Sequence, residues 1–210
     1  MDYKNIEDSI KKGTTTVAVA CADGVVVGAD SRATMDTFIA STEAVKVNKI
    51  DKNIAMTIAG SVGDAEYLVK ILKVQNELYK MNENKPLSPT SATSLISLIL
   101  QETKFAPYYV QLIIAGMNGD VPEIYNLDMA GGYTKESFTS TGSGSLTALG
   151  YLEDVYKKEK TTQEAVKDVI KALKVAMKRD SATGNNIRIA VLTKGSYKEY
   201  YGPEVEKLIK

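Results

Sequence analysis

A glycine–threonine junction at Gly13 and Thr14 is the part of this sequence whose residue types could perform chemistry. If the peptide bond between them were cut, the new α-amine would lie on the residue that also carries the hydroxyl. An α-amine has an unperturbed pKa of about 7.7–8.0, so it can act as a base at neutral pH, whereas a lysine at about 10.4 cannot. Gly13 has no side chain to hinder attack on its carbonyl. On propensity alone, the threonines 14–16 fit better as β-formers that open a strand.

The absence of histidine from all 210 residues makes this terminal amine more attractive as a base. Nucleophile systems of the Ser-His-Asp and Cys-His kinds are excluded, because neither has its base. A zinc site would have to use carboxylates and one thiolate, which is a poor ligand set. Neither a phosphate-binding G-x-x-x-x-G-K-[ST] sequence nor a strand-linked G-x-G-x-x-G occurs, so nucleotide binding lacks support. An enzyme with this sequence must use an amine or a carboxylate as its base.

Two charged residues could activate the hydroxyl of Thr14. Asp30 lies in the strand-like "VVVGADSR", where an acid is normally exposed and, if buried, would need a cation. Lys46 lies in "EAVKVNK", where a surface lysine on an edge strand is the ordinary interpretation. If the two residues met beside Thr14, the ammonium charge would lower the pKa of its hydroxyl. Taken one at a time, each residue fits an exposed position better.

Other residues also have two interpretations. Asp180 ends a helix where its charge opposes the helix dipole, so it either forms a turn or is held there to orient a hydroxyl or amine. Ser143 in "TGSGS" fits a loop or a helix cap. Gly60 in "IAGSVGDA" fits a tight strand-to-helix turn, and backbone N–H groups there could form an oxyanion hole. Cys21 alternates within an apolar strand and is expected in the core.

Hydrophobic periodicity predicts blocks of strands separated by pairs of helices. Asp23-Gly24 is a hairpin turn signal, and Thr161 with Glu164 forms a capping box. The predicted strands are 14–21, 24–31, 41–50, 53–60, 108–116, 123–128, a short one near 136–141, 187–193 and 197–202. Helices are predicted from Asp64, from Ser88-Pro89, after "GSGS" and from Thr161, with a short one at the C-terminus. We therefore expect an α+β chain whose two antiparallel sheets stack and are flanked by helix pairs, a single four-layer αββα sandwich.

The composition indicates which binding partners and which cellular compartment to expect. Lys+Arg and Asp+Glu are both 26, so no net charge points to nucleic acid or an anionic membrane. One cysteine cannot form an internal disulfide, which suits a reducing compartment. The first thirteen residues contain no apolar stretch of a secretory signal, and no apolar run approaches the roughly 20 residues that span a bilayer. We expect a soluble, cytoplasmic protein.

Four stretches together resemble a proteasome β subunit of the archaeal type, within the N-terminal-nucleophile hydrolases. They are "GTTTVAVACADGVVVGADSRAT", "AMTIAGSVGDA", "STGSGS" and "MKRDSATG", in the order and at the spacing of that family. The resemblance covers the chain from Thr14 to about the last strand. It implies that residues 1–13 are a propeptide removed by autocleavage between Gly13 and Thr14, and that residues 14–210 are a single catalytic domain.

The resemblance also implies roles for the candidate residues. Thr14 is the nucleophile, with Asp30 and Lys46 as its charged partners, and Ser143 and Asp180 position the α-amine and the attacking water. The remaining implied residues are Thr183, where the family has a serine, Gly60 as the oxyanion N–H, Thr34 for the substrate backbone, and Ala33, Ala44, Ile58 and Val62 as the lining of the side-chain pocket. That small apolar lining predicts cleavage after hydrophobic residues with broad specificity.

The implied assembly is a ring of seven identical or related β subunits, stacked in pairs between rings of α subunits. Unfolded polypeptides would be the substrates, an ATP-dependent unfoldase would act only indirectly, and no cofactor or catalytic metal is expected. Two other functions stay open. One is a non-catalytic ring-building subunit of the same fold, and the other is a related amidase that acts on small molecules.

Overall fold

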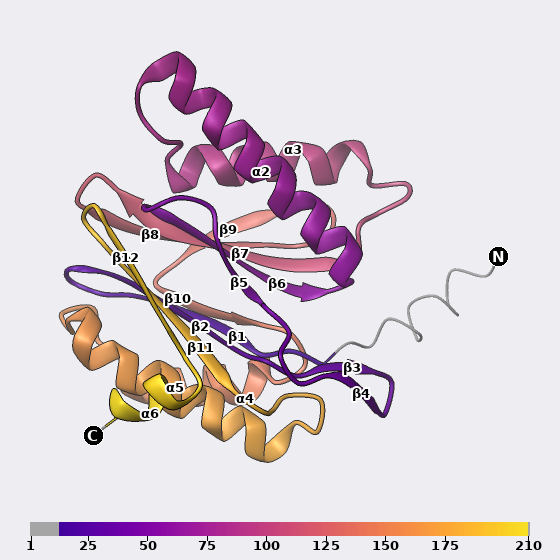
Figure 1. Ribbon diagram of the computed structural model, residues 1–210, viewed down its shortest axis with the longest axis vertical. Helices are drawn as coiled ribbons and strands as arrows, with labels where there is room; N and C mark the ends of the chain where they lie inside the picture. Colours follow the sequence, from indigo (N-terminus) through magenta and orange to yellow (C-terminus); the bar gives the residue numbers. More distant parts are fainter. Residues whose placement is uncertain (1–12, 210) are drawn as a thin grey trace.

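Two antiparallel sheets pack face to face, and helices cover their outer faces (Figure 1). The computed structural model describes residues 13–209, so all of the predicted propeptide except Gly13 lies outside the described residues. Among the described residues, no helix is both long enough and apolar enough to cross a membrane.

The first sheet carries the start of the described chain and has the strand order β10-β1-β2-β11-β12. The predicted hairpin turn at Asp23-Gly24 is confirmed, because β1 and β2 pair antiparallel on either side of it. The strands of this sheet are β1 (Thr16–Ala20), β2 (Gly24–Asp30), β10 (Phe138–Thr141), β11 (Ile187–Thr193) and β12 (Ser196–Tyr201).

The second sheet has the order β5-β6-β7-β8-β9, with β5 at one edge. Its strands are β5 (Val47–Lys49), β6 (Ile54–Gly60), β7 (Val110–Asn118), β8 (Val121–Leu127) and β9 (Tyr133–Glu136). A separate two-stranded hairpin consists of β3 (Ala33–Met35) and β4 (Phe38–Ser41).

Side-chain alternation along the strands builds the core in layers. In β2, Val25 and Val27 pack between the sheets against residues such as Ile113 of β7. Val26, on the opposite face of the same strand, packs under the helices of the first sheet together with Val17. A strand buried on both faces reads as a nearly continuous apolar run, and "GVVVGA" has that composition.

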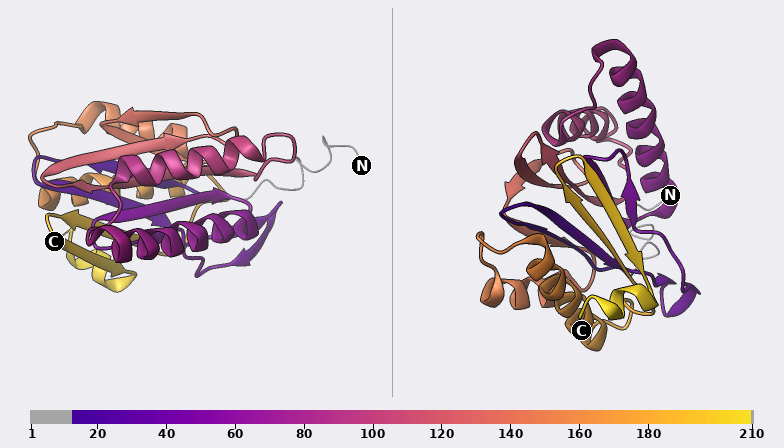
Figure 2. Two further views of the ribbon diagram at one scale, coloured as in Figure 1. Left: turned by 90° about the horizontal axis from the view of Figure 1, so that it is seen from above. Right: turned by 60° about the vertical axis from the view of Figure 1, so that its left-hand side comes forward.

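Each sheet has a pair of helices on its outer face. Helices α2 (Val62–Glu83) and α3 (Pro89–Glu102) lie side by side on the second sheet (Figure 2). Helices α4 (Ser145–Val155) and α5 (Thr162–Arg179) cover the first sheet, and α6 (Pro203–Lys207) follows the last strand. The capping box predicted at Thr161 is confirmed, because its side chain accepts from the Glu164 backbone N–H and Glu164 bonds back to the Thr161 N–H.

The strand prediction was wrong in two segments. Six strands, not four, occupy the described residues 13–60, because residues 33–41 form the β3–β4 hairpin and the predicted strand 41–50 shrinks to Val47–Lys49. The single short strand expected near 136–141 is two strands, β9 in the second sheet and β10 in the first. The chain crosses from one sheet to the other between them, which sequence alternation alone does not reveal.

Candidate active site around Thr14

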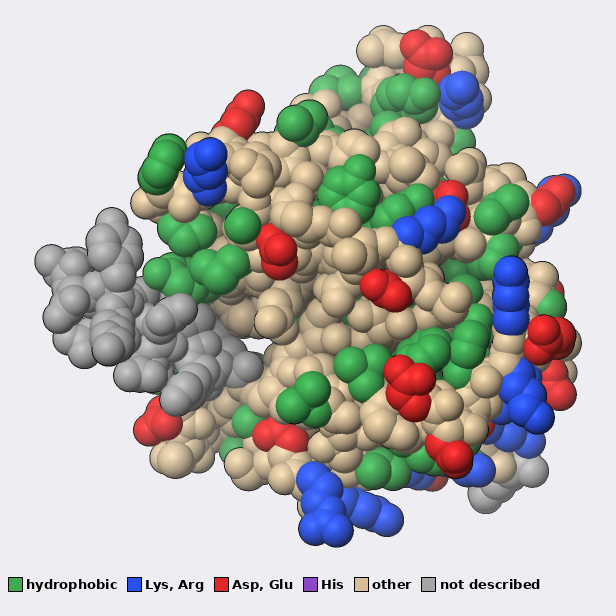
Figure 3. All heavy atoms as spheres, turned by 180° about the vertical axis from the view of Figure 1, so that it is seen from behind, with side chains coloured by type: hydrophobic (Ala, Val, Ile, Leu, Met, Phe, Trp, Pro, Cys, Tyr) green, Lys and Arg blue, Asp and Glu red, His purple; other side chains and the backbone are tan. Residues whose placement is uncertain are grey.

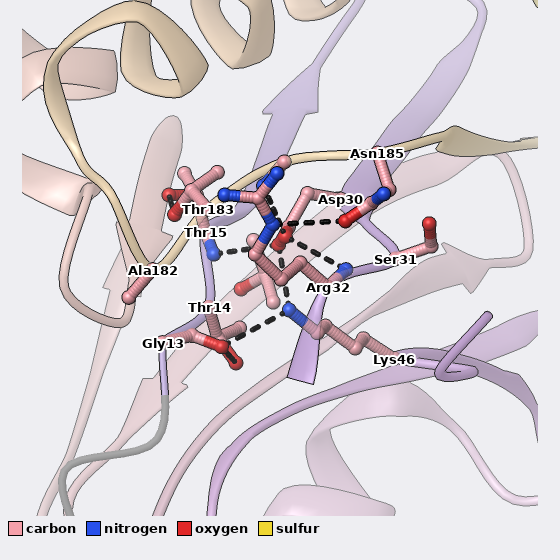
Figure 4. A network of polar contacts seen from close by, with 12 residues as sticks. Gly13, Thr14, Thr15, Asp30, Ser31, Arg32, Lys46, Ala182, Thr183 and Asn185 are labelled. Carbon is pink, nitrogen blue, oxygen red and sulfur yellow. Dashed lines mark hydrogen bonds and ion pairs between the residues drawn. The ribbon is translucent and has the colours of Figure 1, made fainter. Parts of the chain in front are cut away.

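The predicted site residues gather where several elements end close together. The described chain enters at Gly13, just before β1, and meets the last residue of β2, the approach to β5 and the loop after α5 (Figure 4). Loop ends supported by packed strands are common positions for functional residues, because the scaffold holds them and the loops leave room for a ligand.

The hydroxyl of Thr14 and the ammonium of Lys46 converge on one carbonyl oxygen. Thr14 Oγ1 donates to the Gly13 oxygen at 2.7 Å, and Lys46 Nζ donates to the same oxygen at 3.2 Å. Thr34 holds the other side of this peptide, because its Oγ1 accepts from the Gly13 N–H at 2.8 Å. A side chain at residue 13 would not fit here: an added Cβ would lie 1.9 Å from the Cβ of Ala182.

Asp30 is buried, and the Lys46 ammonium supplies the cation that its carboxylate needs. Its Oδ1 lies 2.7 Å from Lys46 Nζ and accepts the Thr15 N–H at 2.9 Å. Its Oδ2 accepts the N–H groups of Arg32 at 3.1 Å and Gly184 at 2.9 Å. The carboxylate therefore ties the start of β1, the end of β2 and the loop after α5 to the ammonium.

Burial changes the chemistry of this pair. Asp30 is 1% exposed and Lys46 is 5% exposed, so the surface positions favoured by the sequence pattern are wrong for both. Removal from water lowers the pKa of Lys46 below its ordinary value, and the neighbouring Asp30 carboxylate opposes that change. A buried charge is tolerated where a partner and hydrogen bonds compensate it, and this pair has both.

A second polar chain lies on the other side of Thr14. Ser143 Oγ accepts the Thr14 N–H at 3.3 Å and donates to Asp180 Oδ2 at 2.5 Å. Thr183 Oγ1 also donates to that carboxylate oxygen at 2.5 Å and contacts Thr15 Oγ1 at 2.7 Å. Asp180 is the C-cap of α5, as its place at the helix end predicted. Its carboxylate thus organises hydroxyls around the backbone nitrogen of Thr14.

Gly60 has a backbone conformation that requires glycine. Its φ is +104°, and an added Cβ would lie 2.2 Å from the carbonyl oxygen of Tyr109. The N–H of Ser61, the residue after β6, donates to the Tyr109 carbonyl, so the preceding Gly60 N–H faces the opposite edge of the strand. That edge is where Ile58 N–H donates to the Lys46 carbonyl, next to the cluster.

Two cavities adjoin the Gly13–Thr14 junction. The smaller, of about 350 Å³, is lined by both junction residues and by Lys46. All four residues predicted to line a side-chain pocket also border it: Ala33, Ala44, Ile58 and Val62. The larger cavity, of about 860 Å³, is lined by Gly13, Thr34, Gly60 and Ser143, and it extends toward β4 and β7. The structure therefore places every predicted site residue in the cluster or in one of these cavities.

Sequence reasoning missed the residue that secures the loop after α5. Arg32 Nη1 donates to the Ser181 carbonyl at 2.7 Å, and its Nε donates to Asn185 Oδ1 at 2.8 Å. Arg32 lies in "GADSRAT", but nothing in the sequence around a single arginine after a strand indicates which distant loop it contacts. Thr15 was also missed as a partner of Thr183, because the two residues are distant in sequence.

The arrangement suits attack by a hydroxyl on a carbonyl. A threonine hydroxyl, a cation on the adjacent carbonyl oxygen, a carboxylate that holds the cation, and cavities on both sides are the parts of a nucleophilic hydrolase site.

Comparison with known proteins gives the family. The profile described as "Proteasome subunit" matches residues 10–192. The proteasome subunit beta of Methanosarcina barkeri is 44% identical over 202 residues, 96% of each chain. The proteasome subunit beta of Methanococcus aeolicus is 46% identical over 199 residues, which are 94% of this chain and 92% of the relative. That of Archaeoglobus profundus is 42% identical over 205 residues, which are 97% of this chain and 95% of the relative. The chain therefore belongs to the proteasome subunit family.

Proposed function

We propose that the chain is a catalytic β subunit of a proteasome core, a threonine endopeptidase that matures by cutting its own Gly13–Thr14 bond. The single observation that carries this proposal is the convergence of the Thr14 hydroxyl and the Lys46 ammonium on the Gly13 carbonyl oxygen. Residues 1–13 are then the propeptide, and residues 14–210 are one catalytic domain. Its layers form the four-layer αββα sandwich of the N-terminal-nucleophile hydrolases.

In the precursor, Thr14 Oγ1 attacks the Gly13 carbonyl carbon. The Lys46 ammonium stabilises the negative charge that develops on the carbonyl oxygen, which it already contacts at 3.2 Å. The C–O bond forms as the C–N bond breaks, and the proton that the hydroxyl loses is balanced by the proton that the Thr14 nitrogen gains, so an ester and a free amine form with no net uptake or release of protons. Water then hydrolyses the resulting ester, so that the propeptide leaves with a carboxylate and Thr14 keeps a free amine.

In the mature enzyme, that amine is the general base. Ser143, oriented by Asp180, lies 3.3 Å from the Thr14 nitrogen and positions it and the attacking water. Thr183 donates to the same Asp180 carboxylate. Its hydroxyl takes the place of the hydroxyl of the serine that the family has at this position. The Gly60 N–H donates to the oxyanion that forms on the substrate carbonyl. The Thr14 oxygen carries the acyl group of the substrate between acylation and deacylation.

The smaller cavity receives the substrate side chain that precedes the cut. Its lining by Ala33, Ala44, Ile58 and Val62 is apolar, which favours hydrophobic residues with modest discrimination. Thr34 already holds the N–H of Gly13 and would hold a substrate backbone in the same way. The larger cavity would accommodate the rest of an extended peptide.

Assembly with other proteasome subunits accounts for the exposed apolar side chains. Figure 3 shows hydrophobic side chains spread across a broad face of the molecule, with charged groups dispersed among them. Phe38, Met81, Phe105 and Leu146 are each more than two-thirds exposed in the single chain. We propose that seven identical or related β subunits form a ring, paired with a second ring between α-subunit rings, in the cytoplasm. Unfolded chains would enter this chamber, delivered by an ATP-dependent unfoldase.

Intact mass and peptide hydrolysis test this function together. The mature chain should lack residues 1–13, Thr14→Ala should keep them, and only the mature chain should cleave fluorogenic peptides that end in a hydrophobic residue. Thr14→Ser is the matched control, because it keeps the hydroxyl and should mature. If wild type and Thr14→Ala both keep the leader and still assemble, the chain is a non-catalytic ring subunit. If it matures but leaves peptides intact, a small-molecule amidase is the better description.

A further inference from the structure

A chain of hydroxyl groups joins the residue after the nucleophile to the nucleophile's own nitrogen. Thr15 Oγ1 lies 2.7 Å from Thr183 Oγ1, which donates to Asp180 Oδ2 at 2.5 Å (Figure 4). Ser143 Oγ donates to the same carboxylate oxygen at 2.5 Å and accepts the Thr14 N–H at 3.3 Å. Because Thr15 follows Thr14 along the backbone, these contacts close into a ring that passes through Asp180. The Thr15 hydroxyl is the member of this ring to which the proposed reaction gives no task.

The number of hydrogens fixes the direction of the contact between the two threonines. A hydroxyl has one hydrogen to donate and two lone pairs with which to accept. Thr183 gives its hydrogen to the Asp180 carboxylate, so the Thr15 hydroxyl is the donor to Thr183. This donation occupies a lone pair of the Thr183 oxygen and keeps the Thr183 hydrogen directed at the carboxylate.

The packing around these two hydroxyls leaves room for their contact. Thr15 is 0% exposed and Thr183 is 1% exposed. A Cβ added to Gly144 would lie 2.1 Å from Thr15 Oγ1 and 3.2 Å from Thr183 Oγ1, so a glycine is required beside them. Among the described residues that line the two cavities at the Gly13–Thr14 junction, Thr15 does not occur. Its hydroxyl therefore faces the ring and away from the space for a peptide.

Ser143 depends on Asp180 for its orientation, because the serine side chain is itself exposed. An exposed hydroxyl can turn toward water unless a fixed acceptor holds it. Within the described chain, the Asp180 carboxylate is held by the Ala182 N–H at 3.1 Å and by the hydroxyls of Ser143 and Thr183. Loss of the Thr183 donor would free the carboxylate to rotate and would move Ser143 away from the Thr14 nitrogen.

We propose that Thr15 is a positioning residue for peptide hydrolysis; this inference rests on the proposed peptidase function. Its hydroxyl holds Thr183, and Thr183 holds the Asp180 carboxylate. That carboxylate keeps Ser143 against the amine of Thr14, which is the general base. Because Thr15 does not touch the substrate, it affects the rate at which a bound peptide reacts and leaves the strength of peptide binding unchanged.

Replacements of similar shape test this assignment. All chains are made as fusions whose cleavage leaves Thr14 as the first residue, so that none has to mature by itself. Thr15→Val removes the hydroxyl, and we expect kcat for a fluorogenic hydrophobic peptide to fall about three- to tenfold, as the loss of one hydrogen bond allows, with KM unchanged. Thr15→Ser keeps the hydroxyl and should keep wild-type kcat. If Thr15→Ser is as slow as Thr15→Val, the methyl group and not the hydroxyl is responsible, and the inference is wrong.

Thr16→Val is the matched control for the loss of a buried hydroxyl. Thr16 is also 0% exposed, and its Oγ1 contacts Thr141 Oγ1 at 2.6 Å and Thr57 Oγ1 at 3.1 Å, because alternation turns it to the opposite face from Thr15. We expect Thr16→Val to lose at least as much stability in urea as Thr15→Val but to keep wild-type kcat. Equal losses of kcat in the two variants, or wild-type kcat in Thr15→Val, would overturn the assignment.

A double-mutant cycle tests whether the effect passes through Thr183. Thr183→Val should lower kcat at least as far as Thr15→Val, and the double variant should be no slower than Thr183→Val alone. Losses that multiply would show that Thr15 acts by another route, which contradicts this inference and leaves the peptidase proposal intact. If the wild-type chain that begins at Thr14 cleaves no peptide, the peptidase proposal fails and this inference fails with it.

Discussion

At the scale of single residues, one buried carboxylate organises the site. Asp30 accepts from three backbone N–H groups and from Lys46, so its charge is fully compensated although it is out of water. Removing one member of a buried ion pair is costly because the other charge stays behind without a partner. The same pair sets the position of the Lys46 ammonium on the Gly13 carbonyl.

Asp30→Asn should therefore damage stability and activity together. The amide keeps the shape of the side chain but loses the charge and places a donor against N–H groups or against the Lys46 ammonium. We expect the free energy of unfolding to fall by about 3 kcal/mol, measured by urea unfolding, and peptide hydrolysis to fall at least about 100-fold.

A surface ion pair supplies the control for that prediction. Asp120 and Lys194 lie 2.8 Å apart, but both side chains are about three-quarters exposed. Asp120→Asn should change the free energy of unfolding by less than about 1 kcal/mol and leave hydrolysis unchanged. A similarly small loss for Asp30→Asn would contradict the role given to the buried carboxylate.

At the scale of elements, the site depends on the loop between α5 and β11. That loop carries Asp180 and Thr183, and Arg32, between β2 and β3, holds it through Ser181 and Asn185. The guanidinium reaches two acceptors at once with a fixed planar fork, which a lysine does not reproduce.

Arg32→Lys should loosen this loop without unfolding the sheets. We expect faster amide hydrogen exchange for residues 181–186, unchanged exchange in β1 and β2, and a drop of roughly tenfold in kcat/KM for peptide hydrolysis. Arg179→Lys, an exposed change at the end of α5, is the matched control and should leave all three quantities unchanged. Unaltered exchange in Arg32→Lys would show that the loop is held by other contacts.

At the scale of the whole molecule, packing changes the pKa of the single cysteine, and through it the stability of the folded chain at alkaline pH. Cys21 is buried in the core between the first sheet and its helices, as its alternation predicted. Burial, aided by the nearby Asp23 charge, raises the pKa of its thiol from 9.0 to about 12. At neutral pH the thiol is protonated in both the folded and the unfolded chain, so it contributes no pH dependence there.

The sign of the effect at alkaline pH follows from proton binding. Between pH 9 and about 12 the unfolded thiol loses its proton while the folded thiol keeps it, so stability falls as pH rises. Between pH 8 and pH 10 we expect the free energy of unfolding of the wild type to fall by about 1 kcal/mol more than that of Cys21→Ala. Urea unfolding of both chains at the two pH values measures this difference, and equal losses would contradict the raised pKa.

Local patterns in the sequence were sufficient for most elements. The hairpin turn at Asp23-Gly24, the capping box at Thr161 and the alternation around Cys21 all depend on neighbours within a few residues, and all three predictions were confirmed. The β3–β4 hairpin was missed, and its Phe38 and Ile39 are both exposed. Because neither face of β4 is buried, its sequence is not constrained to alternate apolar and polar residues, and a strand prediction relies on that alternation.

The sequence by itself determined which base the chemistry can use, because the absence of histidine leaves amines and carboxylates, and it determined the residues that match the family motifs. Only the tertiary structure decided that Asp30 and Lys46 are buried partners and that Arg32 secures the loop after α5. The physical reason is that burial and pairing join residues that lie 16 to 154 positions apart along the chain. A local pattern specifies the strand on which a residue lies, but the packing of the sheets and loops fixes what that residue meets.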